Sequence, residues 1–119
     1  MQFEVNVAAV GEWSVVAVAG EVDVATAPKL REQTIALVAQ GHHRMVIDLE
    51  AVDFLDSTGL GVLVGVQRRV RAAGGELRVV CTTPHIVELF EITGLDRVFD
   101  IRASVGAATG DATPAGGVA

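Results

Sequence analysis

Residues 46–65 read VIDLEAVDFLDSTGLGVLVG, and this stretch decides the fold. Its apolar beginning predicts a short strand over Met45–Leu49, followed by a loop that crosses Phe54. A helix is expected over Ser57–Ala73, because the apolar residues then keep helical spacing until Gly74-Gly75 interrupts it. A strand that leads directly into a helix is half of a crossover unit in a parallel sheet.

The residues before this stretch predict a hairpin and a helix. Phe3–Ala8 alternates apolar and polar side chains, and Trp13–Ala19 is a valine-rich run, so the two together indicate antiparallel strands. Gly20–Ala25 is expected to be a loop. Thr26 can then cap a helix that tolerates proline in its first turn and continues to Gly41.

The residues after it predict two more strands and one more helix. A strand is expected over Glu76–Cys81, a helix from Thr83 to Gly94, and a last short strand over Val98–Ile101. The order β-β-α-β-α-β-α-β predicts an α/β fold, a mixed sheet of four or five strands with helices packed on it. We expect one domain over residues 1–102 and a flexible Ala/Gly/Thr-rich tail over residues 103–119. Removal of the tail from Gly106 onward should leave the melting temperature nearly unchanged.

Composition narrows the classes of function. The 119 residues are 50% hydrophobic and carry a net charge of −6, which is typical of one folded domain and unfavourable for binding nucleic acid or an anionic membrane. No apolar stretch reaches the roughly 20 residues that span a bilayer, and Met1-Gln2-Phe3-Glu4 does not resemble the start of a signal peptide. We therefore expect a cytoplasmic protein in which the single cysteine, Cys81, is a buried apolar residue.

Asp56-Ser57-Thr58-Gly59 is the candidate functional segment. One such side chain is enough to cap a helix, and here three stand in a row, so a capping role and a functional role both stay open. Gly59, Gly61 and Gly65 weaken the start of the helix, and we expect them to mark a close approach of the backbone to another element. The first two turns are apolar nearly all round, which predicts either burial or a surface for a partner.

The same residues resemble a known family. VIDLEAVDFLDSTGLGVLVG, with Gly20-Glu21-Val22-Asp23 and Thr26-Ala27-Pro28 upstream, is similar to the STAS domain of bacterial anti-sigma factor antagonists, over about residues 3–102. In that family a serine at the start of this helix is phosphorylated, and the matching position is Ser57. The resemblance also implies a partner-binding surface made of Asp23, Thr26, Asp56, Ser57, Thr58, Gly59, Leu60 and Gly61.

The resemblance implies a partner switch rather than an enzyme. The unphosphorylated antagonist binds an anti-sigma factor, a GHKL-type serine kinase, and so frees a sigma factor; a PP2C-type phosphatase removes the phosphate. No cofactor or metal is implied, and a monomer or weak dimer is expected. Asp23 is equally well explained as a loop-forming residue and as a partner contact. A ligand-sensing or scaffold subunit of a larger regulatory or transport assembly is the alternative.

Three other interpretations, two of them enzymatic, fit the residues poorly. An aspartic protease needs Gly two residues after the Asp and a second carboxylate, whereas here Gly59 stands three residues after Asp56. A serine hydrolase needs Gly-x-Ser-x-Gly, which Ser57 does not have around it. A receiver domain needs a lysine late in the chain, whereas the only lysine is Lys29. His42-His43 lacks neighbours at metal-ligand spacing and is expected to be a solvated turn.

Overall fold

The computed structural model describes residues 2–110, which form one five-stranded sheet in the order β1-β2-β3-β4-β5. β1 and β2 pair as an antiparallel hairpin, and each later strand adds in parallel. The mixed α/β fold predicted from the order of elements is therefore confirmed. The strands are β1 (Glu4–Val10), β2 (Trp13–Val22), β3 (Arg44–Leu55), β4 (Glu76–Val80) and β5 (Asp100–Arg102).

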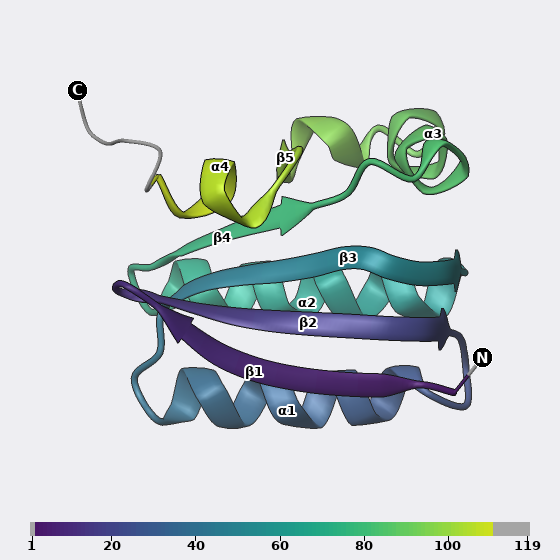
Figure 1. Ribbon diagram of the computed structural model, residues 1–119. Coiled ribbons are helices and arrows are strands. Elements are labelled where there is room, and N and C mark those ends of the chain that lie inside the picture. The colour runs from purple at the N-terminus through teal and green to yellow at the C-terminus, as the bar shows by residue number, and fades with distance from the viewer. Residues whose placement is uncertain (1, 111–119) are drawn as a thin grey trace.

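The helices cover the two faces of the sheet unequally (Figure 1). Three α-helices share one hydrophobic core with one face, and a short C-terminal helix packs on the opposite face. The helical elements are α1 (Ala27–Ala39), α2 (Ser57–Ala72), α3 (Pro84–Ile92), the 3-10 helix η1 (Leu95–Arg97) and α4 (Val105–Thr109). Within the described residues no helix is long and apolar enough to cross a membrane.

The strands place alternate residues in the two cores, as a period of two requires. Met45 and Ile47 of β3 face α1 and α2, whereas Val46 between them joins Trp13 and Val15 under α4. Cys81 is buried as expected, and burial raises the pKa of its thiol, so the thiol stays protonated at neutral pH.

Two strands extend beyond their predicted ends. β3 continues from Leu49 to Leu55, and β2 continues through Gly20 to Val22, where a loop was expected. The pairing register shifts twice along this stretch, because β3 has an extra residue each time relative to β2, and the Asp48 carboxylate accepts a hydrogen bond from the Glu50 amide. These irregularities break the strict alternation that sequence patterns rely on, and so the predicted strand was too short.

Gly20 lies inside β2, although the sequence predicts a loop there. Its φ is +93°, and a Cβ atom there would lie 2.8 Å from the carbonyl oxygen of Gln2. The glycine therefore permits the close approach of the backbone that precedes β1 rather than opening a loop.

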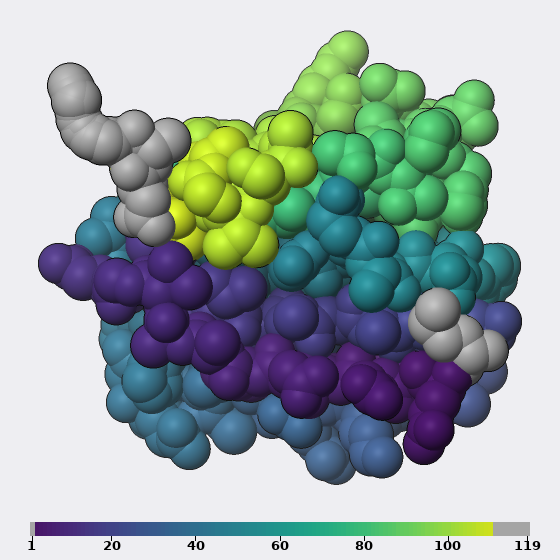
Figure 2. All heavy atoms as spheres, viewed as in Figure 1, coloured from purple at the N-terminus to yellow at the C-terminus, as the bar shows by residue number. Residues whose placement is uncertain are grey.

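The boundary expected at residue 102 is too early. α4 follows β5 and covers the second face of the sheet, where the yellow atoms of Figure 2 lie, with Ala108 fully buried. Arg78 and Arg102 donate to the carbonyl oxygens of Ala108 and Ala107, at 2.7 and 2.9 Å. Small residues can pack closely without a bulky apolar pattern, which is why the segment resembled a flexible tail. The remainder of that predicted tail, residues 111–119, lies outside the described residues.

Candidate functional site

The candidate site lies where β2 and β3 end and α1 and α2 begin, at the right-hand edge of Figure 1. The two parallel strands finish side by side, and the Asp56 amide donates to the Val22 carbonyl oxygen at 3.2 Å. Loops at the carboxyl ends of parallel strands are the common location of functional residues in α/β folds. The topology thus brings together the two sequence motifs, which are more than 30 positions apart in the chain.

Within the Asp56-Ser57-Thr58 cluster, one residue performs the capping. Asp56 is the N-cap of α2, and its Oδ1 accepts a hydrogen bond from the Gly59 amide at 3.0 Å. Ser57 and Thr58 are exposed, and their hydroxyl groups form no hydrogen bond within residues 2–110. The helix start is therefore satisfied without them, which leaves the Ser57 hydroxyl free for chemistry with another molecule.

The glycines of α2 have two different roles. Gly59 is buried, and a Cβ atom there would lie 2.5 Å from Leu55 Cδ1 and 2.9 Å from Val22 Cγ1, so the predicted close approach is confirmed at this position. The same prediction is wrong for Gly61 and Gly65, where a Cβ atom would meet nothing within 4 Å.

The predicted partner surface divides into exposed and buried residues. Leu60 and Gly59 lie in the core, so their side of the helix cannot contact a partner while the fold is intact. Gly61 is exposed and stands four residues after Ser57, which places both on one face of α2. The absence of a side chain at Gly61 keeps the approach to Ser57 open along that face.

The loop between β2 and α1 is held by its own side chains. Asp23 Oδ1 accepts hydrogen bonds from the amides of Ala25 and Thr26, at 2.9 and 3.1 Å. Thr26 occupies the N-cap position of α1, but its hydroxyl donates to the Glu21 carbonyl oxygen at 2.7 Å and does not cap the helix. The expectation that Thr26 is a side-chain cap is wrong, and the loop-forming role of Asp23 is confirmed.

Exposed apolar side chains beside the site escaped sequence reasoning. Val24 is 73% exposed in the β2–α1 loop, and Phe54 is 47% exposed next to Leu55 at the end of β3. The sequence predicts a loop at Phe54, whereas the last part of β3 pairs Phe54 with Glu21 of β2 and so fixes it beside the β2–α1 loop. Large exposed apolar residues next to an unengaged hydroxyl are typical of a protein-binding surface.

A second set of missed contacts joins β3 to the start of α3. The Glu50 carboxylate accepts from both the amide and the hydroxyl of Thr82, at 2.6 and 2.8 Å, and His85 Nε2 lies 2.8 Å from the Asp53 carbonyl oxygen. These bonds orient α3 at the same end of the sheet as Ser57. The partners are 32 residues apart, so no local pattern could reveal them.

The site is acidic. Glu21 and Asp53 lie near the ends of β2 and β3, Asp23 and Asp56 follow those strands, and no ion pair in residues 2–110 involves any of the four. No group of three metal-ligating side chains occurs in that part of the chain either. A modification that adds negative charge at Ser57 would therefore create a dense anionic surface.

The mixed five-stranded sheet and the sequence that forms it identify the family of the domain. The chain belongs to the STAS domain family, whose family model matches residues 4–108. Among its relatives, the anti-sigma-B factor antagonist of Bacillus subtilis is 44% identical over 86 residues, which are 72% of this chain and 78% of that protein. The protein of the same name from Listeria monocytogenes is 38% identical over 94 residues, covering 79% and 82% of the two chains.

A solved structure agrees with these relatives. The crystal structure of an anti-sigma factor antagonist from Mycobacterium paratuberculosis superposes with a TM-score of 0.85 and 34% sequence identity. The match covers 92% of this chain and 93% of that one, so the whole arrangement of sheet and helices is shared.

Proposed function

We propose that this protein is a cytoplasmic anti-sigma factor antagonist, a regulator without catalytic activity of its own. In its unphosphorylated form it binds an anti-sigma factor through the exposed loops around Ser57 and so releases a sigma factor. The observation that carries the proposal is the exposed Ser57 hydroxyl, which the fold does not use because Asp56 caps α2. The relatives named as antagonists support the same role.

The proposed switch is phosphorylation of Ser57 by the anti-sigma factor itself, a GHKL-type kinase, with a PP2C-type phosphatase as the resetting enzyme. A phosphate adds about 1.5–2 negative charges at the positive end of the α2 dipole, where the fold tolerates it. The partner surface does not, because it must then desolvate a phosphate next to the carboxylates of the site. Binding is lost through local charge and bulk, without refolding.

The acceptor assignment is tested with the cognate anti-sigma factor and Mg-ATP. We expect one phosphate per chain, mapped to Ser57 by mass spectrometry, and none on Ser57→Ala. Thr58→Ala is the matched control, since Thr58 is the neighbouring exposed hydroxyl, and this variant should be phosphorylated like the parent. Phosphate on Thr58, or undiminished labelling of Ser57→Ala, would refute the assignment.

The switching mechanism is tested with Ser57→Asp. Aspartate is favoured at the first turn of a helix by about 0.3–1 kcal/mol, and repulsion by the half-buried Asp56 carboxylate is of similar size, so stability should change by less than about 1 kcal/mol. Affinity for the anti-sigma factor should fall by roughly 100-fold or more, because an uncompensated charge at an interface costs several kcal/mol. Calorimetric affinities equal to those of the parent would favour the ligand-sensing or scaffold alternative.

A further inference from the structure

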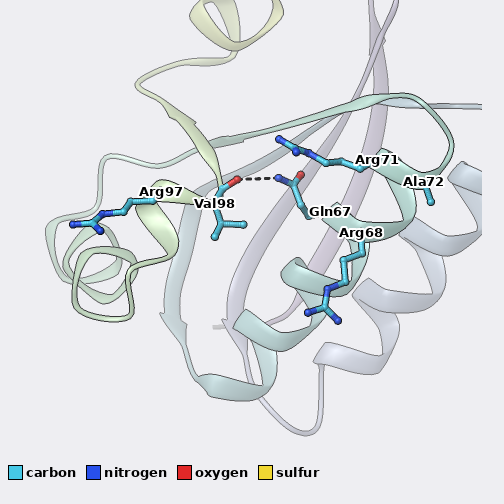
Figure 3. Close-up of a pocket in the computed structure, with 6 residues that line it drawn as sticks. All are labelled: Gln67, Arg68, Arg71, Ala72, Arg97 and Val98. Atoms are coloured by element: carbon cyan, nitrogen blue, oxygen red, sulfur yellow. Dashed lines mark hydrogen bonds between the residues drawn. The ribbon is translucent and has the colours of Figure 1, made fainter.

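A surface groove lies at the far end of α2 from Ser57, between that helix and η1 (Figure 3). Its volume is about 620 Å³, within the range of small-molecule sites. Six residues line it: Gln67, Arg68, Arg71, Ala72, Arg97 and Val98. Three of the six are arginines and none is acidic, in a chain whose net charge is −6.

The arginines of the groove, like the exposed Arg31 and Arg69 outside it, form no ion pair among the described residues. Arg44, Arg78 and Arg102 form ion pairs with carboxylates on the opposite face of the sheet. Among the described residues, Arg68, Arg71 and Arg97 form none. In Figure 3, Arg68 and Arg71 extend from α2 on either side of Gln67, while Arg97 extends outward from η1. Like charges repel, and the groove holds no anion of its own that would draw the three together.

Gln67 contributes a second, independent feature. Its side chain is only 6% exposed, and its Nε2 donates to the Val98 carbonyl oxygen at 2.9 Å. That bond fixes the orientation of the amide, because a flipped amide would place its oxygen against the carbonyl. Oε1 of Gln67 is buried behind the wall of the groove and has no hydrogen-bond partner among the described residues.

We propose that this groove binds a small soluble phosphate monoester. Guanidinium groups pair with phosphate through charge-assisted hydrogen bonds, and arginines from two elements suit a tetrahedral dianion, whose oxygens point in different directions, better than a planar carboxylate. Val98 and Ala72, which line the groove beside the arginines, contact the carbon atoms of the ligand. The net charge of −6 argues against the same phosphate chemistry on an anionic lipid surface. This site is independent of the proposed function of Ser57.

The test is an NMR titration of the ¹⁵N-labelled protein with glycerol 3-phosphate at constant ionic strength, with glycerol and inorganic phosphate in parallel. We expect saturable amide shifts in residues 67–72 and 97–98, tighter binding of glycerol 3-phosphate than of phosphate, and no shifts with glycerol. Arg68→Gln and Arg97→Gln should each weaken binding about tenfold through loss of a charge-assisted hydrogen bond. Arg31→Gln, at an exposed position on α1, is the matched control and should bind like the parent.

Three results would overturn the proposal. Shifts that do not saturate, or that Arg31→Gln reduces as much as Arg97→Gln does, would mean non-specific charge screening. Shifts outside the groove would place the ligand elsewhere. Co-sedimentation with phosphatidylglycerol vesicles that depends on Arg68 and Arg97, without saturable binding of glycerol 3-phosphate, would assign the groove to a lipid headgroup. Circular dichroism spectra of all variants establish that the substitutions leave the fold intact.

Discussion

Alanine substitutions at Gly59 and Gly61 should change stability in opposite directions, although only Leu60 separates the two positions in the same helix turn. At Gly59 a Cβ atom would lie 2.5 Å from Leu55 Cδ1, 2.9 Å from Val22 Cγ1 and 3.2 Å from the Val22 carbonyl oxygen. Leu55 and Val22 are both buried, and the Val22 carbonyl accepts the Asp56 amide, so neither can move without disturbing the start of α2. At Gly61 the same atom would meet nothing within 4 Å.

The magnitudes follow from two terms. Replacing glycine by alanine inside a helix gains about 1 kcal/mol at either position. Overpacking a filled core costs about 1–3 kcal/mol, and only Gly59→Ala incurs it. Gly59→Ala should therefore be less stable than Gly61→Ala by about 1–3 kcal/mol. The gain in helix propensity is the same in both variants, so it does not contribute to this difference. Gly61→Ala alone should exceed the parent by up to about 1 kcal/mol, or roughly 4 °C in melting temperature.

Urea unfolding followed by circular dichroism measures both variants against the parent, and unchanged m-values would establish that the denatured state is the same. If both variants shift stability equally, the packing of α2 against the ends of β2 and β3 is not as described. Gly61→Ala also separates folding from binding, because its methyl group stands on the face of α2 that carries Ser57. We expect this more stable variant to bind the anti-sigma factor more weakly than the parent.

Two further predictions concern the opposite face of the sheet. A chain that ends at Arg102 lacks α4, so Trp13 and its apolar neighbours become exposed. This chain should be less stable than a chain that ends at Gly110 by about 2–4 kcal/mol. Equal thermal denaturation midpoints of the two chains would contradict the packing of α4. The Arg102 guanidinium, which hydrogen-bonds to Asp100, lowers the pKa of that carboxyl below its ordinary value. A lowered pKa stabilises the fold above the ordinary pKa and ceases to do so as the pH falls through the lowered value. Asp100→Asn should therefore reduce the free energy of unfolding by less than about 1 kcal/mol at pH 7, since the ion pair is exposed. In acid titrations of the parent and the variant, this difference in stability should shrink below about pH 4. A difference that does not depend on pH would contradict the prediction.

Local features of the fold could be predicted from the sequence because short segments determine them. The alternation of Phe3–Ala8 and the valine run after Trp13 predicted the hairpin, and the glycines after Ala73 predicted the end of α2 within one residue. Ser57 could be placed at the start of that helix because a cluster of capping residues follows an apolar strand. Burial of Cys81 followed from its apolar neighbours.

Only the tertiary structure decided the features that depend on distant contacts. Gly59 and Gly61 have the same local propensity, and only the positions of Leu55 and Val22 leave no room for a side chain at Gly59. The extent of β3 depends on its irregular pairing with β2, in which the register shifts twice. The helix over 105–109 depends on the sheet face against which it packs and on hydrogen bonds from Arg78 and Arg102 to its carbonyl oxygens. Leu60 faces the core and Phe54 the solvent because the sheet, rather than their own hydrophobicity, determines which side of each element is covered. Local patterns encode the period of an element, whereas the partner against which it packs is a property of the whole fold.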